Sequence, residues 1–311
     1  MTGRLDWRGW LALTRASNLP TVWSNVLAGA GIGHVIGRTP SPPGHPFTLP
    51  IVGVLIGTSL LYLAGMMLND VCDYRVDRFE RPDRPLPSGR VDRRSAAVAT
   101  IIAMAAGIGA SIAAGWRAAV LAMALAGAIA AYDLLHKRHA WAAALMGLCR
   151  GLVYLMAVTA AVVAAPRGAP AVTAGIIVAS IMATYTLLIT LSARGEASPD
   201  RPQPRRWPGV AMLLVPPALA AAVAFHAIER PPGLTLLAIV ALAAAVLWLG
   251  RSLLLLRRRP PRVGPAVEGC LAGFCLIDAM LLAWLGLPAL AAAAAGLFVL
   301  THLAHHRIRG T

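Results

Sequence analysis

Ten mostly apolar stretches follow one another along the chain, separated by short polar segments. They cover residues 18–37, 49–70, 94–114, 117–135, 141–164, 170–193, 209–227, 233–255, 264–284 and 287–304. Each is close to the roughly 20 residues that an apolar helix needs to cross a bilayer. The pattern therefore predicts an all-α fold, a polytopic transmembrane helix bundle that forms a single domain over 1–311. The break at 286–288 makes the last two stretches either two spans or one span with a re-entrant piece, so we expect nine or ten spans.

The composition and the distribution of charge agree with a membrane protein. Hydrophobic residues make up 58% of the chain and charged residues 13%, against about 25% charged in soluble domains. The net charge of +15 does not indicate nucleic acid, because 23 of the 28 Lys and Arg residues fall on one side of the threaded chain and four on the other. Positive charge collects on the cytoplasmic side. We expect both termini and the loops 71–93 and 194–208 to be cytoplasmic, in the inner membrane of a bacterium.

One acidic segment carries the strongest chemical signal. Asn69, Asp70, Asp73 and Asp77 form the pattern N-D-x-x-D-x-x-x-D at the end of the second apolar stretch. If the helix continues past the membrane edge, the three carboxylates lie on one face, at i, i+3 and i+7. Such a cluster is unfavourable without a cation between its members. Hard oxygen ligands are those that Mg²⁺ prefers, together with phosphate oxygens.

A cationic run follows the carboxylates directly. It includes Arg78 and Arg84, and prolines at 82, 85 and 87 prevent a helix there. Carboxylates that hold Mg²⁺ beside arginine side chains are typical of a diphosphate-binding site. A solvated loop that follows the positive-inside rule would explain the arginines, but not carboxylates in helical register.

This segment closely resembles the first Asp-rich motif of the UbiA superfamily of intramembrane prenyltransferases, N-D-x-x-D-x-x-x-D followed by R-P-x-P-S-G. Here the second part reads Arg84-Pro85-Leu86-Pro87-Ser88-Gly89. The resemblance implies a helix bundle that transfers a prenyl group, with Mg²⁺, from a polyprenyl diphosphate to an aromatic or other electron-rich acceptor.

Further positions fit the resemblance. It implies that Asn25 lines the site, although a buried Asn also serves as a helix–helix contact. It also implies that Tyr132 and Lys137 lie at the diphosphate, although Lys137 alone would suit a positive-inside anchor. Arg150 lies inside an apolar stretch, where a charge is costly and usually functional. Arg150 binds either the diphosphate or an anionic acceptor, or it pairs with an Asp.

The chain departs from the family at the second Asp-rich motif, usually D-x-x-x-D. The nearest match is Glu196 and Asp200, with Gly195 and Pro199 interrupting the helix. Either these two carboxylates still hold metal in a loop, or one metal ion binds tightly, or the branch has drifted to another substrate. The neighbouring LSARGE pattern looks like the UbiA-like members encoded in ebo-type clusters.

We therefore predict a Mg²⁺-dependent prenyltransferase with Asp70, Asp73, Asp77 and Lys137 as catalytic residues. The predicted metal ligands are Asp70, Asp73, Asp77, Glu196 and Asp200, and the predicted substrate-binding residues are Asn25, Asn69, Arg78, Arg84, Tyr132 and Arg150. The sequence pattern of CDP-alcohol phosphatidyltransferases is absent, since no Gly follows Asp70. The alternative is a carrier or transporter that binds a polyprenyl lipid without turnover and has a degenerate second motif.

Overall fold

The computed structural model describes residues 6–38, 48–163, 167–193, 207–224, 231–258 and 261–307, and every regular element in these ranges is a helix. The α-helices are α1 (Trp7–Leu13), α2 (Leu19–Gly37), α3 (Leu49–Glu80), α4 (Arg93–Ile112), α5 (Trp116–Leu135), α6 (Ala143–Ala161), α7 (Gly168–Ala193), α8 (Trp207–Leu213), α9 (Val215–Ala224), α10 (Pro232–Leu254), α11 (Val263–Trp284) and α12 (Pro288–Arg307). Short 3₁₀ turns at Ala16–Asn18, Ala140–Ala142 and Leu255–Arg257 flank three of them.

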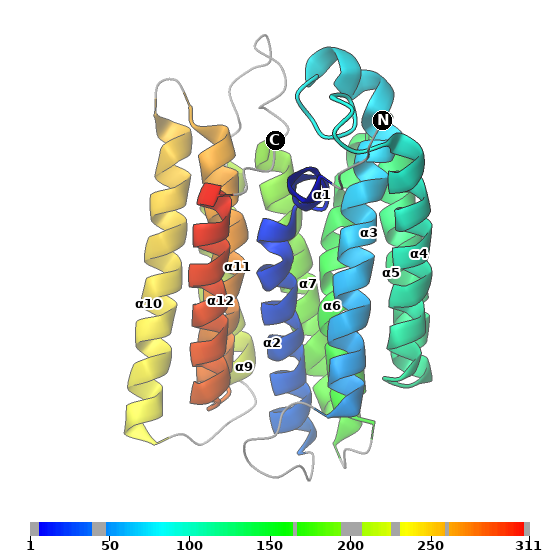
Figure 1. Ribbon diagram of the computed structural model, residues 1–311. Helices are drawn as coiled ribbons and strands as arrows, with labels where there is room; N and C mark the ends of the chain where they lie inside the picture. The colour runs from blue at the N-terminus through cyan, green and yellow to red at the C-terminus, as the bar shows by residue number, and fades with distance from the viewer. Residues whose placement is uncertain are drawn as a thin grey trace.

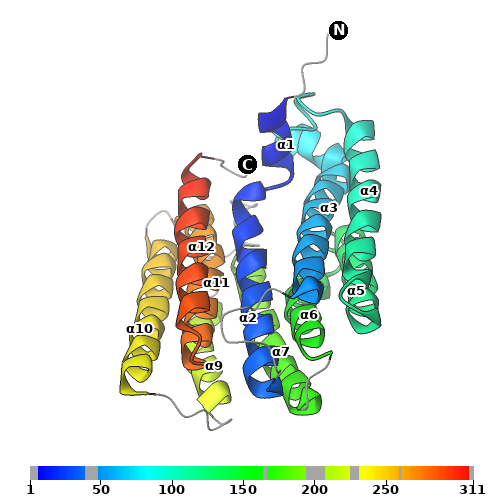
Figure 2. The same cartoon turned by 60° about the horizontal axis from the view of Figure 1, so that its bottom comes forward.

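The long helices run side by side as a bundle, with α2 at its centre (Figures 1 and 2). Helix α2 lies between a group formed by α10, α11 and α12 and a group that contains α3 and α6. Fourteen of its 19 residues are buried, among them the polar residues Thr21, Ser24 and Asn25. These polar side chains are tolerated in a mostly apolar helix because neighbouring helices, rather than lipid, surround them.

Among the described residues, eight helices are long and apolar enough to cross a membrane: α3, α4, α5, α6 with its leading turn, α7, α10 with its trailing turn, α11 and α12. The other two predicted spans correspond to α2 and to the pair α8 and α9, which together form a shorter apolar segment. The all-helical membrane fold is thus confirmed. The number of spans and the side on which the termini lie stay predictions.

Helix α3 extends well beyond the predicted span 49–70. It continues as one 32-residue helix to Glu80, so the first ten residues of the predicted loop 71–93 are helical. The non-helical segment is 81–92, where the prolines prevent further helix. The helical register assumed for the three aspartates is therefore present.

Segment 81–92 folds back over the same end of the bundle as α1 (Figure 1). The Nε atom of Arg90 donates a hydrogen bond to Asp6, the N-cap residue of α1, at 2.9 Å. Leu86 and Val91 are buried in a small apolar cluster with Leu13 and Met67. These contacts hold the segment at the end of α3, next to the aspartates.

We predict that Gly29→Val lowers the stability of the bundle. A Cβ at this position of α2 would lie 2.7 Å from the backbone oxygen of Tyr154 and 2.7 Å from the Cβ of Ala157, so α2 and α6 would have to separate. Overpacking of this kind costs about 1–3 kcal/mol. The thermal unfolding midpoint of the purified protein in detergent measures the loss.

Gly109→Val is the matched control, because a Cβ on this helical glycine of α4 meets nothing within 4 Å. It should unfold at or above the midpoint of the unmodified protein. Equal losses in the two variants would contradict close packing of α2 on α6.

Candidate functional site

Two of the three aspartates of α3 converge on a single cationic nitrogen. Asp70 and Asp77 are 5% and 4% exposed. The Nη1 atom of Arg84 lies 2.7 Å from Oδ2 of Asp77 and 3.6 Å from Oδ1 of Asp70. Arg15 Nη2 approaches Asp70 Oδ1 from the other side, at 3.1 Å. The two carboxylates thus form one cation-binding position, which here holds a guanidinium.

Asp73 faces a different partner at the end of α5. Its Oδ1 lies 2.6 Å from Nζ of Lys137, and its Oδ2 lies 3.6 Å from Nε2 of His136. Hydrogen bonding to the Asp73 carboxylate raises the pKa of the His136 imidazole. In this structure the three carboxylates are divided between Arg84 and Lys137, and their joint binding of one Mg²⁺ stays a prediction.

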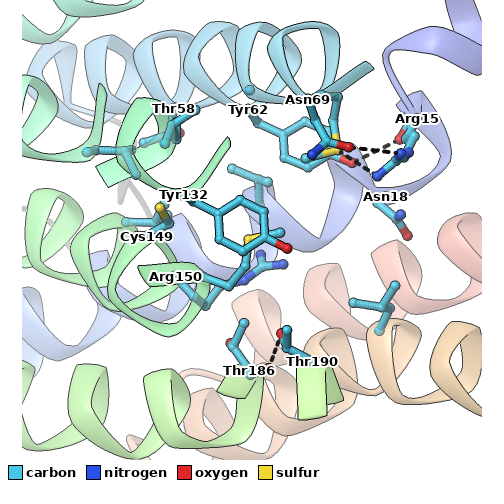
Figure 3. Close-up of a pocket in the computed structure, with 18 of the residues that line it drawn as sticks. Arg15, Asn18, Thr58, Tyr62, Asn69, Tyr132, Cys149, Arg150, Thr186 and Thr190 are labelled. Atoms are coloured by element: carbon cyan, nitrogen blue, oxygen red, sulfur yellow. Dashed lines mark hydrogen bonds between the residues drawn. The ribbon is translucent and has the colours of Figure 1, made fainter. Parts of the chain in front are cut away.

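A cavity of about 240 Å³ lies beside these carboxylates (Figure 3). Arg15 and Asn69 line the cavity near the aspartates of α3. Arg15 also donates a hydrogen bond to Asp70 and so connects the cavity to the carboxylate cluster. Tyr132 and Arg150, two of the predicted substrate-binding residues, line its walls. The remaining wall is largely apolar and includes Val22, Leu125, Ile129, Met146, Val153, Ile189 and Leu271.

The cavity itself is lined by a carboxylate that the sequence analysis did not select, Asp133. Asp133 is 6% exposed, and its Oδ1 accepts a hydrogen bond from the Asn69 amide at 3.0 Å. Its Oδ2 has no hydrogen-bond partner within the described ranges. The signal was available, because a carboxylate at the end of an apolar stretch is costly and usually functional.

Asn25 is fully buried behind the cavity and reaches it only through Arg150. Its Oδ1 accepts from Nη1 of Arg150 at 2.6 Å, and its Nδ2 donates to Asp278 at 2.7 Å. Asp278, on α11, also accepts hydrogen bonds from Ser24 and Tyr154, both at 2.6 Å. Of the two roles considered for Asn25, the helix–helix contact is the one its geometry supports.

One predicted residue lies apart from the cluster, and two are not among the described residues. Arg78 is exposed and lies over the ring of Tyr74, 5.9 Å from its centroid. Glu196 and Asp200 fall outside the described residues. Within the part of the chain that the structure describes, no group of three or more His, Cys, Asp or Glu side chains is arranged to hold a metal ion.

The donor chemistry nevertheless fits Mg²⁺. The carboxylates offer only hard oxygen atoms, and those of Asp70 and Asp77 already point at one shared position. Mg²⁺ in proteins is bound by one or two carboxylates together with substrate phosphates and water, so two convergent aspartates suffice for the protein's share.

The helical membrane bundle with its acidic cluster and apolar cavity defines an intramembrane protein with a polar site at one end. Residues 20–267 match the UbiA prenyltransferase family, and the chain belongs to that family. The digeranylgeranylglyceryl phosphate synthase of Thermococcus gammatolerans is 32% identical over 104 residues, which are 33% of this chain and 35% of that protein. The sequence match thus spans about a third of the length of this curated relative.

Two solved structures share the fold at low sequence identity. A UbiA homologue from Aeropyrum pernix K1, solved without ligand, has a TM-score of 0.61 and 17% identity over 88% of this chain and 96% of its own. A UbiA homologue from Archaeoglobus fulgidus bound to DMAPP and Mg²⁺ has a TM-score of 0.53 and 18% identity, over 91% of this chain and 99% of its own.

We predict that Arg84→Met destabilises the protein and that Mg²⁺ reverses much of the loss. The substitution leaves Asp70 and Asp77 buried without their shared counter-ion, and breaking a buried ion pair costs about 3–5 kcal/mol. A divalent cation can then enter the vacated position and stabilise the folded state by binding. Thermal unfolding with and without MgCl₂ measures both effects.

Arg75→Met removes an exposed arginine of α3, the helix that carries the two aspartates, and serves as the control. It should leave the unfolding midpoint and its response to MgCl₂ unchanged. If MgCl₂ raises the midpoint of the Arg84 variant no more than that of the unmodified protein, the two aspartates do not form a cation site.

Proposed function

We propose that this protein transfers a prenyl group from a polyprenyl diphosphate to an acceptor, with Mg²⁺, at the cytoplasmic side of the membrane. The observation that carries the proposal is the convergence of Asp70 and Asp77 on one cationic position beside an apolar cavity. A carboxylate-held cation suits a diphosphate, and an apolar cavity inside a membrane bundle suits the isoprenoid attached to it.

The diphosphate end of the substrate would lie at the carboxylate cluster. Asp70, Asp73 and Asp77 would hold Mg²⁺, which supplies neutralisation of the leaving pyrophosphate. Arg84 and Lys137, now paired with these carboxylates, would donate hydrogen bonds to phosphate oxygens. Arg78 would meet the diphosphate from the solvent side. Glu196 and Asp200 would add ligands from the loop 194–208.

The prenyl chain would occupy the apolar part of the cavity. Its apolar walls would limit the access of water to a developing allylic cation. The ring of Tyr132 lines the same space and can stabilise positive charge through its face. Breaking the bond between the allylic carbon and oxygen releases pyrophosphate, and an electron-rich atom of the acceptor forms the new bond to that carbon.

The relatives support the donor class. The Archaeoglobus fulgidus homologue was solved with DMAPP and Mg²⁺ bound. The Thermococcus gammatolerans relative carries the name of a synthase that makes a digeranylgeranylated glyceryl phosphate. Both are consistent with an isoprenoid diphosphate as the substrate that this chain binds at its acidic end.

We predict that Asp73→Asn lowers Mg²⁺-dependent pyrophosphate release from geranyl diphosphate by at least about 100-fold. The substitution removes the negative charge that faces Lys137 and that would hold the metal. Purified protein in detergent, assayed for pyrophosphate with and without MgCl₂, gives the measurement. Asp83→Asn, at an exposed position of the following segment, is the control and should retain full activity.

Full turnover by the Asp73 variant would show that the first acidic motif is not the metal site. Mg²⁺-dependent binding of geranyl diphosphate without any pyrophosphate release by the unmodified protein would instead support the carrier.

We predict a smaller loss, about tenfold, for Glu196→Ala in the same assay, since the second motif is degenerate and the donor site keeps its three aspartates. A loss as complete as that of the Asp73 variant would indicate that the two acidic motifs contribute equally to turnover.

A further inference from the structure

Arg150 places a guanidinium inside the bundle without a carboxylate partner. It lies seven residues into α6 from Ala143, about 10 Å along the helix axis. No Asp or Glu in the described ranges lies within ion-pair distance of it. A charge at such a depth is costly and marks a functional site by default. The nearby carboxylate Asp278 is linked to Arg150 only through Asn25, so the guanidinium has no direct anionic partner.

The surrounding residues hold Arg150 in one orientation. Its Nη1 donates to Oδ1 of Asn25 at 2.6 Å, and its Cζ lies 4.2 Å above the ring centroid of Phe274. A carboxylate can only accept hydrogen bonds, so the Nδ2 side of the Asn25 amide faces Asp278. This orientation leaves Oδ1 of Asn25 facing Arg150. Ser24 and Tyr154 complete the hydrogen bonds of Asp278. Asp278 is thus a positioning residue that acts on Arg150 through Asn25.

The other side of the guanidinium is available to a ligand. Within the described residues, Nη2 and Nε of Arg150 make no hydrogen bond. Neither atom is completely buried, in contrast to Nε of Arg84, which is buried and has no partner. Arg150 lines the cavity, so its remaining donors are accessible from that space. Figure 3 shows the guanidinium between Tyr132 and Thr186, apart from the contact of Arg15 with Asn69.

We propose that Arg150 binds the acidic group of the acceptor, which makes the acceptor substrate an anion with a carboxylate or phosphate group. This inference rests on the proposed prenyl transfer. It assigns Arg150 to the acceptor rather than to the diphosphate because the carboxylate cluster has its own cations, Arg84 and Lys137. A second fixed cation on α6, anchored to α2 and α11, provides a second anion site in the same cavity.

The test measures the binding of small anionic probes that need no turnover. Full-length protein in detergent is titrated with benzoate, with phenylphosphonate and with the neutral isostere benzamide, by calorimetry. We expect the unmodified protein to bind at least one anion about tenfold or more tightly than benzamide, as a charge-assisted hydrogen bond does. Benzoate against phenylphosphonate then separates a carboxylate from a phosphate-type acceptor.

The variants locate the site. Arg150→Met should bind the anions no better than benzamide, while Mg²⁺-dependent affinity for geranyl diphosphate stays within about twofold. Arg150→Lys, which keeps the charge, should retain part of the preference and covers the case in which the Met variant does not fold. Arg117→Met is the matched control, since Arg117 also lies over an aromatic ring, 5.5 Å from the centroid of Trp116, but outside the cavity. It should leave every affinity unchanged.

Several results would overturn the inference. These are equal binding of the anions and benzamide by the unmodified protein, an anion preference that survives Arg150→Met, and competition between the preferred anion and geranyl diphosphate. The last would assign Arg150 to the donor. Failure of the proposed function is distinct, because it would appear as absent Mg²⁺-dependent binding or cleavage of geranyl diphosphate, whatever the anions do.

Discussion

The ion pairs of Arg84 with Asp70 and Asp77 fix the geometry of the polar end of the bundle. The two carboxylates are buried one above the other on α3, where each would repel the other and lack water. One guanidinium nitrogen serves both, and it comes from the segment that folds back after α3 ends. The same contact therefore stabilises the extension of α3 and holds segment 81–92 over the site. Because the pairs are buried, loss of the positive charge between the two carboxylates would be costly.

The residues that gather at this end of the bundle could be predicted from the sequence, since their arrangement depends on local spacing. Asp70, Asp73 and Asp77 share a helix, and i, i+3 and i+7 positions share a face whatever surrounds them. Arg84 lies only seven residues beyond Asp77, on a chain that proline forces to turn. The division of the three carboxylates between Arg84 and Lys137 could not be predicted in the same way. It depends on where the end of α5 meets α3, which is a matter of packing between distant segments.

The hydrogen-bond network around Asp278 could be predicted from the sequence even less. Ser24 and Asn25 contact Asp278 across more than 250 residues of sequence, and no spacing rule connects them. What the sequence does offer is the cost of each charge in an apolar stretch, which singles out Arg150, Asp133 and Asp278. That signal was applied to Arg150 but not to Asp133, which lines the cavity. The cost of burial indicates that a charge has a purpose, and only the fold shows its partner.

The distribution of charge inside the bundle gives the cavity two different ends. At the C-terminal end of α3, the carboxylates of Asp70, Asp73, Asp77 and Asp133 lie near the cations Arg15, Arg84 and Lys137, and the proposed Mg²⁺ would take the position that Arg84 occupies. At Arg150 the reverse holds, because the carboxylate of Asp278 already accepts three hydrogen bonds and is separated from the guanidinium by Asn25. A low dielectric makes both imbalances costly when the cavity holds no charged ligand. Two substrates, one bound through a cation and one through its own negative charge, would neutralise both ends at once, and the apolar walls between them would hold the reacting carbon away from water.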